Sequence, residues 1–329
     1  MKKVYSIFLL LGILMSVLMS TNADCQTAIV LKGVTAFPKT HPNNDPVPFF
    51  IEEVNKRTQG RLKIEWLGGP EVFASFDQIH ALKAGTIDMI LYYPFGYMKS
   101  VMPEAEAKGL SQLPEWEERK TGAFELWTEI FEKRVNAKYL GRFHNNITFQ
   151  VYSNKRFEKI GDFKGTNIRT MPLYIPFIRS LGANPVTLPP TEIYTSMERG
   201  VVDGFMWPRW GITGFGLQEV TKFIIEPGVF QMEPATMVNL DRWKKIPRDL
   251  QDLVMATMIE YEQIASKRAF TLMDQEYKKM EQAGMKTIKL PPEDGDKFYK
   301  LAYDMTWEQI LKAAPEYGPK LRKAMSKAP

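Results

Sequence analysis

The sequence predicts an α/β protein that consists of two lobes with related topology. Strand-like and helix-like segments alternate along residues 28–92, and the same alternation returns along residues 167–206. This order predicts parallel strands joined by crossover helices. Residues 83–89 (KAGTIDM) and 198–204 (ERGVVDG) take equivalent places in the two cycles. Ligands of such sheets bind outside the carboxyl ends of the strands, so two facing lobes would enclose one.

The first cycle contains three strands and two helices. An apolar segment begins it, and apolar residues at helical spacing follow until Gly60, a C-terminal stop. Alternation of apolar and polar residues then indicates a second strand. The predicted strands lie at residues 28–36, 61–66 and 87–92, and the predicted helices at residues 47–58 and 76–84.

A connecting region and a second cycle follow. We expect a helix over residues 116–135 and a strand over residues 147–153, which passes to the next lobe. The second cycle has predicted strands at residues 167–171, 185–188 and 201–206 and predicted helices at residues 174–181 and 191–199. Residues 248–282 contain no glycine or proline, and as one helix they would extend over ~50 Å. Sustained heptads are absent, so one helix across both lobes is favoured over a coiled coil.

The first 23 residues have the pattern of a signal peptide. Two lysines precede an apolar run, and small residues stand before a cleavage site near Ala23. The run of about 16 residues is short for a membrane span, which makes an uncleaved anchor the weaker alternative. Lipid anchoring at Cys25 is also less favoured, because Asp24 precedes it where a lipoprotein has a small residue. These features predict export to the periplasm.

Composition excludes several classes of protein. The 329 residues are enough for two domains, and 43 basic against 38 acidic residues give a charge of only +5, so nucleic acid is not an expected partner. One cysteine and three scattered histidines provide neither a disulfide framework nor an obvious metal site. Nucleophile-elbow, zinc-protease, P-loop and dinucleotide motifs are missing. We therefore expect no cofactor, no metal and no enzymatic activity.

Several stretches, taken in order, are similar to one family. The chain resembles the periplasmic substrate-binding proteins of tripartite ATP-independent periplasmic (TRAP) transporters, the C4-dicarboxylate-binding (DctP-like) family. The stretches that carry this resemblance are residues 52–65 (EEVNKRTQGRLKIE), 81–89 (ALKAGTIDM), 103–105 (PEA), 162–169 (DFKGTNIR), 181–204 (LGANPVTLPPTEIYTSMERGVVDG) and 237–251 (MVNLDRWKKIPRDLQ).

The resemblance implies a two-lobed periplasmic-binding-protein (Venus-flytrap) fold. Such a protein closes over one ligand and delivers it to a membrane permease, without ATP and without chemistry of its own. A monomer is expected. The expected parts are a signal peptide at residues 1–23, a first lobe at residues 24–146 and 233–272, and a second lobe at residues 147–232 and 273–329.

The resemblance also points to Arg169 as a ligand anchor. In the family, an arginine in this strand binds a substrate carboxylate, and its planar fork can donate two parallel hydrogen bonds. The alternative role is a surface arginine at the end of a strand. Some relatives have a second arginine where this chain has Phe149, and many have a polar residue where it has Trp207. Some relatives present an acidic side chain near Tyr92, where this chain is aromatic.

These departures predict a monocarboxylate ligand with an apolar or aromatic body. Glu71 could accept a hydrogen bond from a ligand hydroxyl or amine, or it could be a solvated loop carboxylate. Relatives that bind 2-oxo acids through a metal tend to have a glutamate beside the residue aligned with Trp207, and this chain has none there. The candidate walls, for each of which ordinary core packing is the alternative, are Phe37, Phe73, Tyr92, Phe149, Met171, Trp207 and Trp210.

The function predicted from the sequence is that of an extracytoplasmic solute-binding protein for an organic acid anion. Two other functions remain open at this point. The same fold could present its bound ligand to a receptor as a sensor, or it could carry a secreted enzyme whose catalytic groups meet only in the folded chain.

Overall fold

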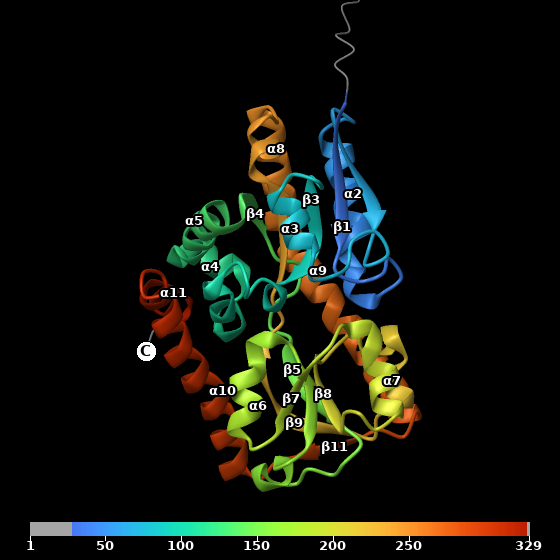
Figure 1. The fold of residues 1–329 in the computed structure, drawn as a ribbon. Coiled ribbons are helices and arrows are strands. Elements are labelled where there is room, and N and C mark those ends of the chain that lie inside the picture. Colours follow the sequence, from blue (N-terminus) through green and yellow to red (C-terminus); the bar gives the residue numbers. More distant parts are fainter. Residues whose placement is uncertain (1–27, 328–329) are drawn as a thin grey trace, which may run out of the picture.

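The computed structural model describes residues 28–327, and it contains two β-sheets with helices packed around each (Figure 1). The two-lobed α/β fold predicted from the sequence is confirmed. The predicted signal peptide and Cys25 lie outside the described residues. Within residues 28–327, no helix has the length and apolar character needed to cross a membrane.

The first sheet has the strand order β2-β1-β3-β10-β4. β1 pairs in parallel with β2 and β3, as expected for strands joined by crossover helices, and β10 is antiparallel to β3 and β4. Its strands are β1 (Ile29–Thr35), β2 (Leu62–Gly68), β3 (Met89–Pro94), β4 (Ala137–Gly141) and β10 (Pro234–Asn239). Its helices are α2 (Pro46–Arg57), α3 (Gln78–Lys83), α4 (Glu115–Thr121), α5 (Ala123–Val135) and α8 (Leu240–Lys244).

The second sheet has the strand order β11-β9-β5-β8-β6-β7. β6 is parallel to β7 and β8, and β5 is antiparallel to β8 and β9. Its strands are β5 (Thr148–Ser153), β6 (Asn167–Thr170), β7 (Asn184–Thr187), β8 (Gly204–Pro208), β9 (Phe223–Gln231) and β11 (Lys286–Lys289). Its helices are α6 (Ile175–Ser180) and α7 (Ile193–Glu198).

Short 3₁₀ segments complete the connections. They are η1 (Pro42–Asn44), η2 (Phe95–Tyr97), η3 (Pro103–Leu110), η4 (Ile160–Phe163), η5 (Pro172–Tyr174), η6 (Pro190–Glu192), η7 (Ile212–Phe215) and η8 (Leu217–Glu219). Two of these matter for the site, because η2 follows β3 and η5 follows β6 at the strand ends that face the other lobe.

The long helix α9 (Arg248–Gln282) has the bounds that the sequence predicts. In the first lobe, the Glu262 carboxylate of α9 accepts hydrogen bonds from the Arg119 guanidinium of α4. Near its other end, the Glu276 carboxylate accepts the backbone N–H groups of Gly211 and Thr213 in the second lobe, at 2.8 and 2.7 Å. One helix therefore joins both lobes, as Figure 1 shows.

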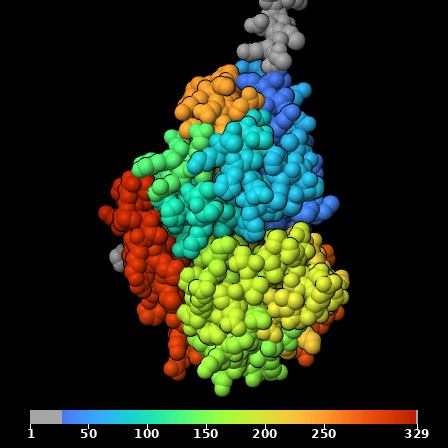
Figure 2. All heavy atoms as spheres, in the orientation of Figure 1, coloured from blue at the N-terminus to red at the C-terminus, as the bar shows by residue number. Residues whose placement is uncertain are grey.

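The C-terminal helices also join the lobes. α10 (Pro292–Ala313) packs on β9, α6 and η3, and α11 (Gly318–Met325) packs on α4, α5 and η3. Figure 2 shows this segment along one side of both lobes, which are in contact on the face in view. The partition at residues 273–329 stays a prediction, and α11 itself lies against helices of the first lobe.

The structure corrects two expected elements. The helix expected over residues 116–135 is two helices, α4 and α5, which are separated at Gly122, whose φ of 83° does not fit a right-handed helix. The strand expected over residues 201–206 is β8, which begins at Gly204. Sequence patterns also missed β4, β9, β10 and β11. Of these strands, β9 and β10 link the lobes, because the chain passes from the second sheet to the first between them.

Candidate ligand-binding site

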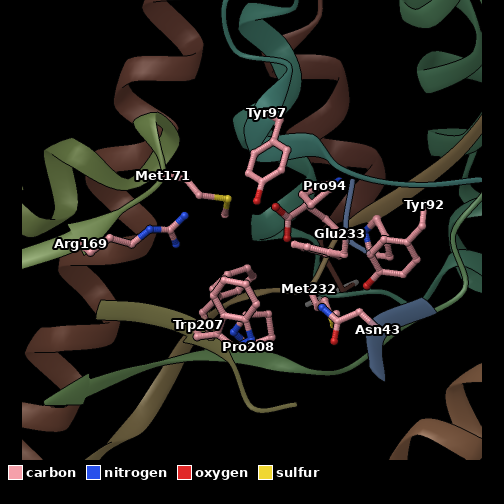
Figure 3. A pocket seen from close by; sticks show the side chains of 13 residues that line it. Asn43, Tyr92, Pro94, Tyr97, Arg169, Met171, Trp207, Pro208, Met232 and Glu233 are labelled. Atoms are coloured by element: carbon pink, nitrogen blue, oxygen red, sulfur yellow. The ribbon is translucent and has the colours of Figure 1, made fainter. Parts of the chain in front are cut away.

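A cavity lies between the lobes and is lined by residues of both. Strand ends position its walls, because β1, β3, β6 and β8 all end at this boundary. Such a place suits a ligand of an open α/β sheet. The lining residues are Phe37, Asn43, Tyr92, Pro94, Tyr97, Phe149, Arg169, Met171, Trp207, Pro208, Met232, Glu233 and Pro234, and Figure 3 labels ten of them.

Six of the nine residues proposed from the sequence line this cavity, and both lobes contribute to them. Phe37 and Tyr92 come from the first lobe and the others from the second. The six residues are Phe37, Tyr92, Phe149, Arg169, Met171 and Trp207.

The other three proposed residues do not line this cavity. The Glu71 carboxylate accepts a hydrogen bond from the backbone N–H of Gly69 at 2.7 Å, so it closes its own turn. Phe73 packs against the hydrophobic core. Trp210 follows β8 and is buried, with its ring edge-to-face on His144 at 4.6 Å. Phe73 and Trp210 are therefore core residues, which is the alternative role expected for the aromatic candidates.

Arg169 is a buried cation without an acidic partner. Its side chain is 1% exposed, which contradicts a surface role. Nε and a terminal nitrogen both donate to the carbonyl oxygen of Leu188, at 3.1 and 3.0 Å. No carboxylate within residues 28–327 lies within ion-pair distance of the guanidinium. Burial lowers the pKa of Arg169, and the neighbouring Tyr97 hydroxyl only partly opposes this shift.

Glu233 is the buried acid of the cavity, and sequence reasoning missed it. It lies between β9 and β10, where the chain returns to the first lobe. One carboxyl oxygen, Oε1, accepts a hydrogen bond from the Tyr174 hydroxyl at 3.3 Å, while Oε2 has no hydrogen-bond partner within the described part of the chain. Burial raises the pKa of Glu233 to about 8, so the carboxyl group is mostly neutral at pH 7. Sequence patterns did not point to Glu233, because neither of the strands that flank it, β9 and β10, was predicted.

Aromatic rings form the apolar wall. Phe37 of the first lobe lies 5.9 Å from Trp207 of the second and 5.8 Å from Tyr92, measured between ring centroids. The guanidinium of Arg169 lies 5.8 Å from the Trp207 ring. The indole N–H of Trp207 has no hydrogen-bond partner among residues 28–327. Such rings can hold a flat or apolar ligand body.

Two further polar residues line the cavity, Tyr97 and Asn43. Burial raises the pKa of Tyr97 to about 12, so its hydroxyl is neutral under ordinary conditions. Asn43 Oδ1 accepts no hydrogen bond from any residue that the structure describes. Aromatic enrichment around residues 92–97 is a signal from which Tyr97 could have been found.

Within residues 28–327, no group of three or more His, Cys, Asp or Glu side chains is arranged to hold a metal ion. The cavity contains one cationic group and one largely neutral carboxyl group, set among aromatic rings. This arrangement can bind a small organic anion of single charge.

Known proteins resemble this chain along most of its length. Residues 33–313 match the sequence profile of the bacterial extracellular solute-binding proteins, family 7 (DctP). The chain is 34% identical to an uncharacterized protein of Haemophilus influenzae over 103 residues, which are 31% of each protein. It is 21% identical to a monocarboxylate 2-oxoacid-binding periplasmic protein of Nostoc sp., over 85% of this chain and 79% of that one.

A solved structure shares the fold. A TRAP periplasmic solute-binding protein from Desulfovibrio salexigens, with bound orotic acid, superposes with a TM-score of 0.80 at 20% identity. The superposition covers 89% of this chain and 96% of that chain.

Proposed function

The chain belongs to family 7 of the bacterial extracellular solute-binding proteins, and we propose that its ligand is an organic acid with one carboxylate and an apolar or aromatic body. The family consists of substrate-binding proteins of TRAP transporters, so the chain is a binding protein and not an enzyme. In this proposal, the protein captures the acid in the periplasm as a monomer and delivers it to a TRAP-type membrane permease.

Arg169 is the observation that carries the proposal. A buried guanidinium without a carboxylate partner is costly, and a ligand carboxylate would compensate its charge with charge-assisted hydrogen bonds. The guanidinium points into the cavity in Figure 3, toward space that a ligand could fill.

The remaining walls support a monocarboxylate with an apolar body. Phe149 and Trp207 offer aromatic surface where a second basic group or an amide would favour a second carboxylate or a polyol. The match to a monocarboxylate 2-oxoacid-binding protein of Nostoc sp. agrees with a single carboxylate. A dianion would leave its second charge buried without a cation.

Thermal shifts and calorimetry test the proposal. The panel contains benzoate, the three pyridinecarboxylates, 4-methylpentanoate, 4-oxopentanoate, succinate and sialic acid. A ligand at 100 times its Kd should stabilise the protein by about 2.7 kcal/mol. We expect at least one monocarboxylate to raise Tm, with little response to succinate. Shifts with succinate or sialic acid, and none with any monocarboxylate, would contradict the proposed ligand class.

The Arg169→Met variant tests the anchor. We expect the Kd of the best monocarboxylate to rise about 100-fold or more, because two charge-assisted hydrogen bonds to the carboxylate are lost. The control is Arg156→Met, since Arg156 is a solvent-exposed arginine of the same lobe, paired only with Glu158. Wild-type affinity in Arg169→Met, measured by isothermal titration calorimetry, would contradict the role of Arg169.

A further inference from the structure

Glu233 combines features that the anchoring of a carboxylate does not explain. Its side chain lines the cavity and is 1% exposed. It forms no ion pair with a described residue, and Oε2 is buried without a hydrogen-bond partner. Figure 3 shows the Glu233 carboxyl group and the Arg169 guanidinium on opposite sides of the cavity, with the Tyr97 hydroxyl between them. A buried polar atom that faces a cavity without a partner is costly unless a ligand satisfies it.

The hydrogen bond from Tyr174 identifies which oxygen can donate. Because the Tyr174 hydroxyl donates to Oε1, a proton on the neutral carboxyl group belongs on Oε2. Oε2 then presents an O–H donor to the cavity. The matching ligand group is a hydrogen-bond acceptor, such as a carbonyl oxygen or a ring nitrogen.

Burial favours the neutral form of Glu233, whereas the Tyr174 hydroxyl, the Arg142 guanidinium and the backbone N–H groups of Gly96 and Glu233 favour its ionised form, and burial is the largest of these effects. Tyr92, Tyr97 and Tyr174 have pKa values raised by burial, so they bring no charge near neutral pH. Arg142 is the basic group behind Glu233, but it is paired with the carboxylates of Glu115 and Glu118 at 3.0 and 3.2 Å. Arg142 and Arg169 therefore differ. Two carboxylates already neutralise the charge of Arg142, whereas Arg169 has no acidic partner within residues 28–327.

The nearby histidines, His41 and His144, bring no charge near Glu233. His144 is hydrogen-bonded to Tyr92, and His41 packs on Phe37. Burial lowers the pKa of each histidine to about 3. Both stay neutral from pH 6 to pH 9.

We propose that Glu233 is a second ligand-recognition residue, which donates a hydrogen bond from neutral Oε2 to an acceptor group on the acid whose carboxylate Arg169 holds. The inference rests on the proposed function and specifies the ligand further: a monoanion with a neutral acceptor group away from its carboxylate. An ionised Glu233 repels such a ligand. Binding therefore weakens as pH rises through the pKa of Glu233.

Two isosteric comparisons test the recognition of an acceptor. The pyridinecarboxylates differ from benzoate by a ring nitrogen at three positions, and 4-oxopentanoate differs from 4-methylpentanoate by a carbonyl oxygen in place of a methyl group. We expect at least one acceptor-bearing acid to bind wild-type protein about tenfold more tightly than its partner, the effect of one hydrogen bond to a buried group. Glu233→Ala should abolish this preference, and Glu233→Gln, which keeps an N–H donor, should retain most of it.

The pH profile of the Kd separates recognition from a structural role. In wild-type protein, the Kd of the best acceptor-bearing acid should be constant from pH 6.5 to 7.5 and rise by up to about tenfold per pH unit above pH 8. Glu233→Gln should give a flat profile over the same range. Glu106→Gln is the control, because Glu106 is also buried, with a pKa raised by burial, but it pairs with Lys99 outside the cavity.

Three results would overturn the inference while the proposed function stands. They are Arg169-dependent binding without any preference for an acceptor, a pH profile that Glu233→Gln leaves unchanged, and binding that requires calcium and disappears in EDTA, which would make Glu233 an ionised metal ligand. Failure of every acid to bind wild-type protein would overturn the proposed function and this inference together.

Discussion

At the scale of single residues, the cavity is defined by one buried charge and one buried neutral carboxyl group that lack partners within residues 28–327. Among the residues that the structure describes, Arg169 lacks a counter-anion and Oε2 of Glu233 lacks a hydrogen-bond partner. The family pattern of residues 162–169 points to Arg169 as the expected anchor. Glu233 has no such signal, because its importance comes from burial and from the hydrogen bond that Tyr174 donates to it.

A prediction for the ligand-free protein follows from the isolation of Arg169. Replacing an unpaired buried cation with methionine removes its desolvation cost along with two hydrogen bonds to Leu188. We expect Arg169→Met to change the free energy of unfolding without ligand by no more than about 1 kcal/mol. Chemical denaturation measures this. A loss of several kcal/mol would show that Arg169 is mainly structural.

At the scale of elements, α4 is held to the first lobe by buried ion pairs. Lys108 of η3 is fully buried and donates to the carboxylates of Glu115 and Glu118, at 2.7 and 2.5 Å. Arg142, which follows β4, pairs with the same two carboxylates. These buried ion pairs hold the short helix α4, which ends just before Gly122, against the first lobe.

Lys108→Met should therefore destabilise the protein strongly. The substitution leaves two buried carboxylates with one fewer counter-charge, and we expect a loss of about 3–5 kcal/mol in the free energy of unfolding. Lys120→Met is the control, because Lys120 belongs to α4, the helix of Glu115 and Glu118, and forms an exposed pair with Glu117, so it should cost less than about 1 kcal/mol. Urea denaturation measures both. Equal stability of the two variants would contradict this account.

At the scale of the whole molecule, the lobes meet through aromatic rings and glycines. His41 and Phe37 of the first lobe pack on Phe215 and Trp207 of the second, with centroid distances of 4.5 and 5.9 Å. A Cβ atom added to Gly214 of η7 would lie 2.5 Å from Pro42 Cδ. The contact thus depends on the absence of a side chain at position 214.

Gly214→Ala should hold the lobes apart. A Cβ at this position overlaps the segment at residues 41–42, so the closed arrangement becomes less accessible. We expect a Kd for the best monocarboxylate about tenfold or more above that of wild type, and a larger radius of gyration in the presence of ligand by small-angle X-ray scattering. Gly161→Ala, with open space around position 161, is the control and should match wild type. Unchanged affinity and size in Gly214→Ala would contradict the role of this contact.

The sequence by itself determined the α/β class, the first-lobe cycle and the full extent of α9, while only the family resemblance pointed to Arg169. Local periodicity and glycine stops determine such elements, because they act within one segment of chain. Tertiary structure decided the pairing of β10 with β3 and β4, the break at Gly122, and the positions of Glu71, Phe73 and Trp210 away from the cavity. Tertiary structure also placed Glu233 opposite Arg169. The burial of each side chain and its hydrogen-bond partners depend on residues that are distant in the sequence.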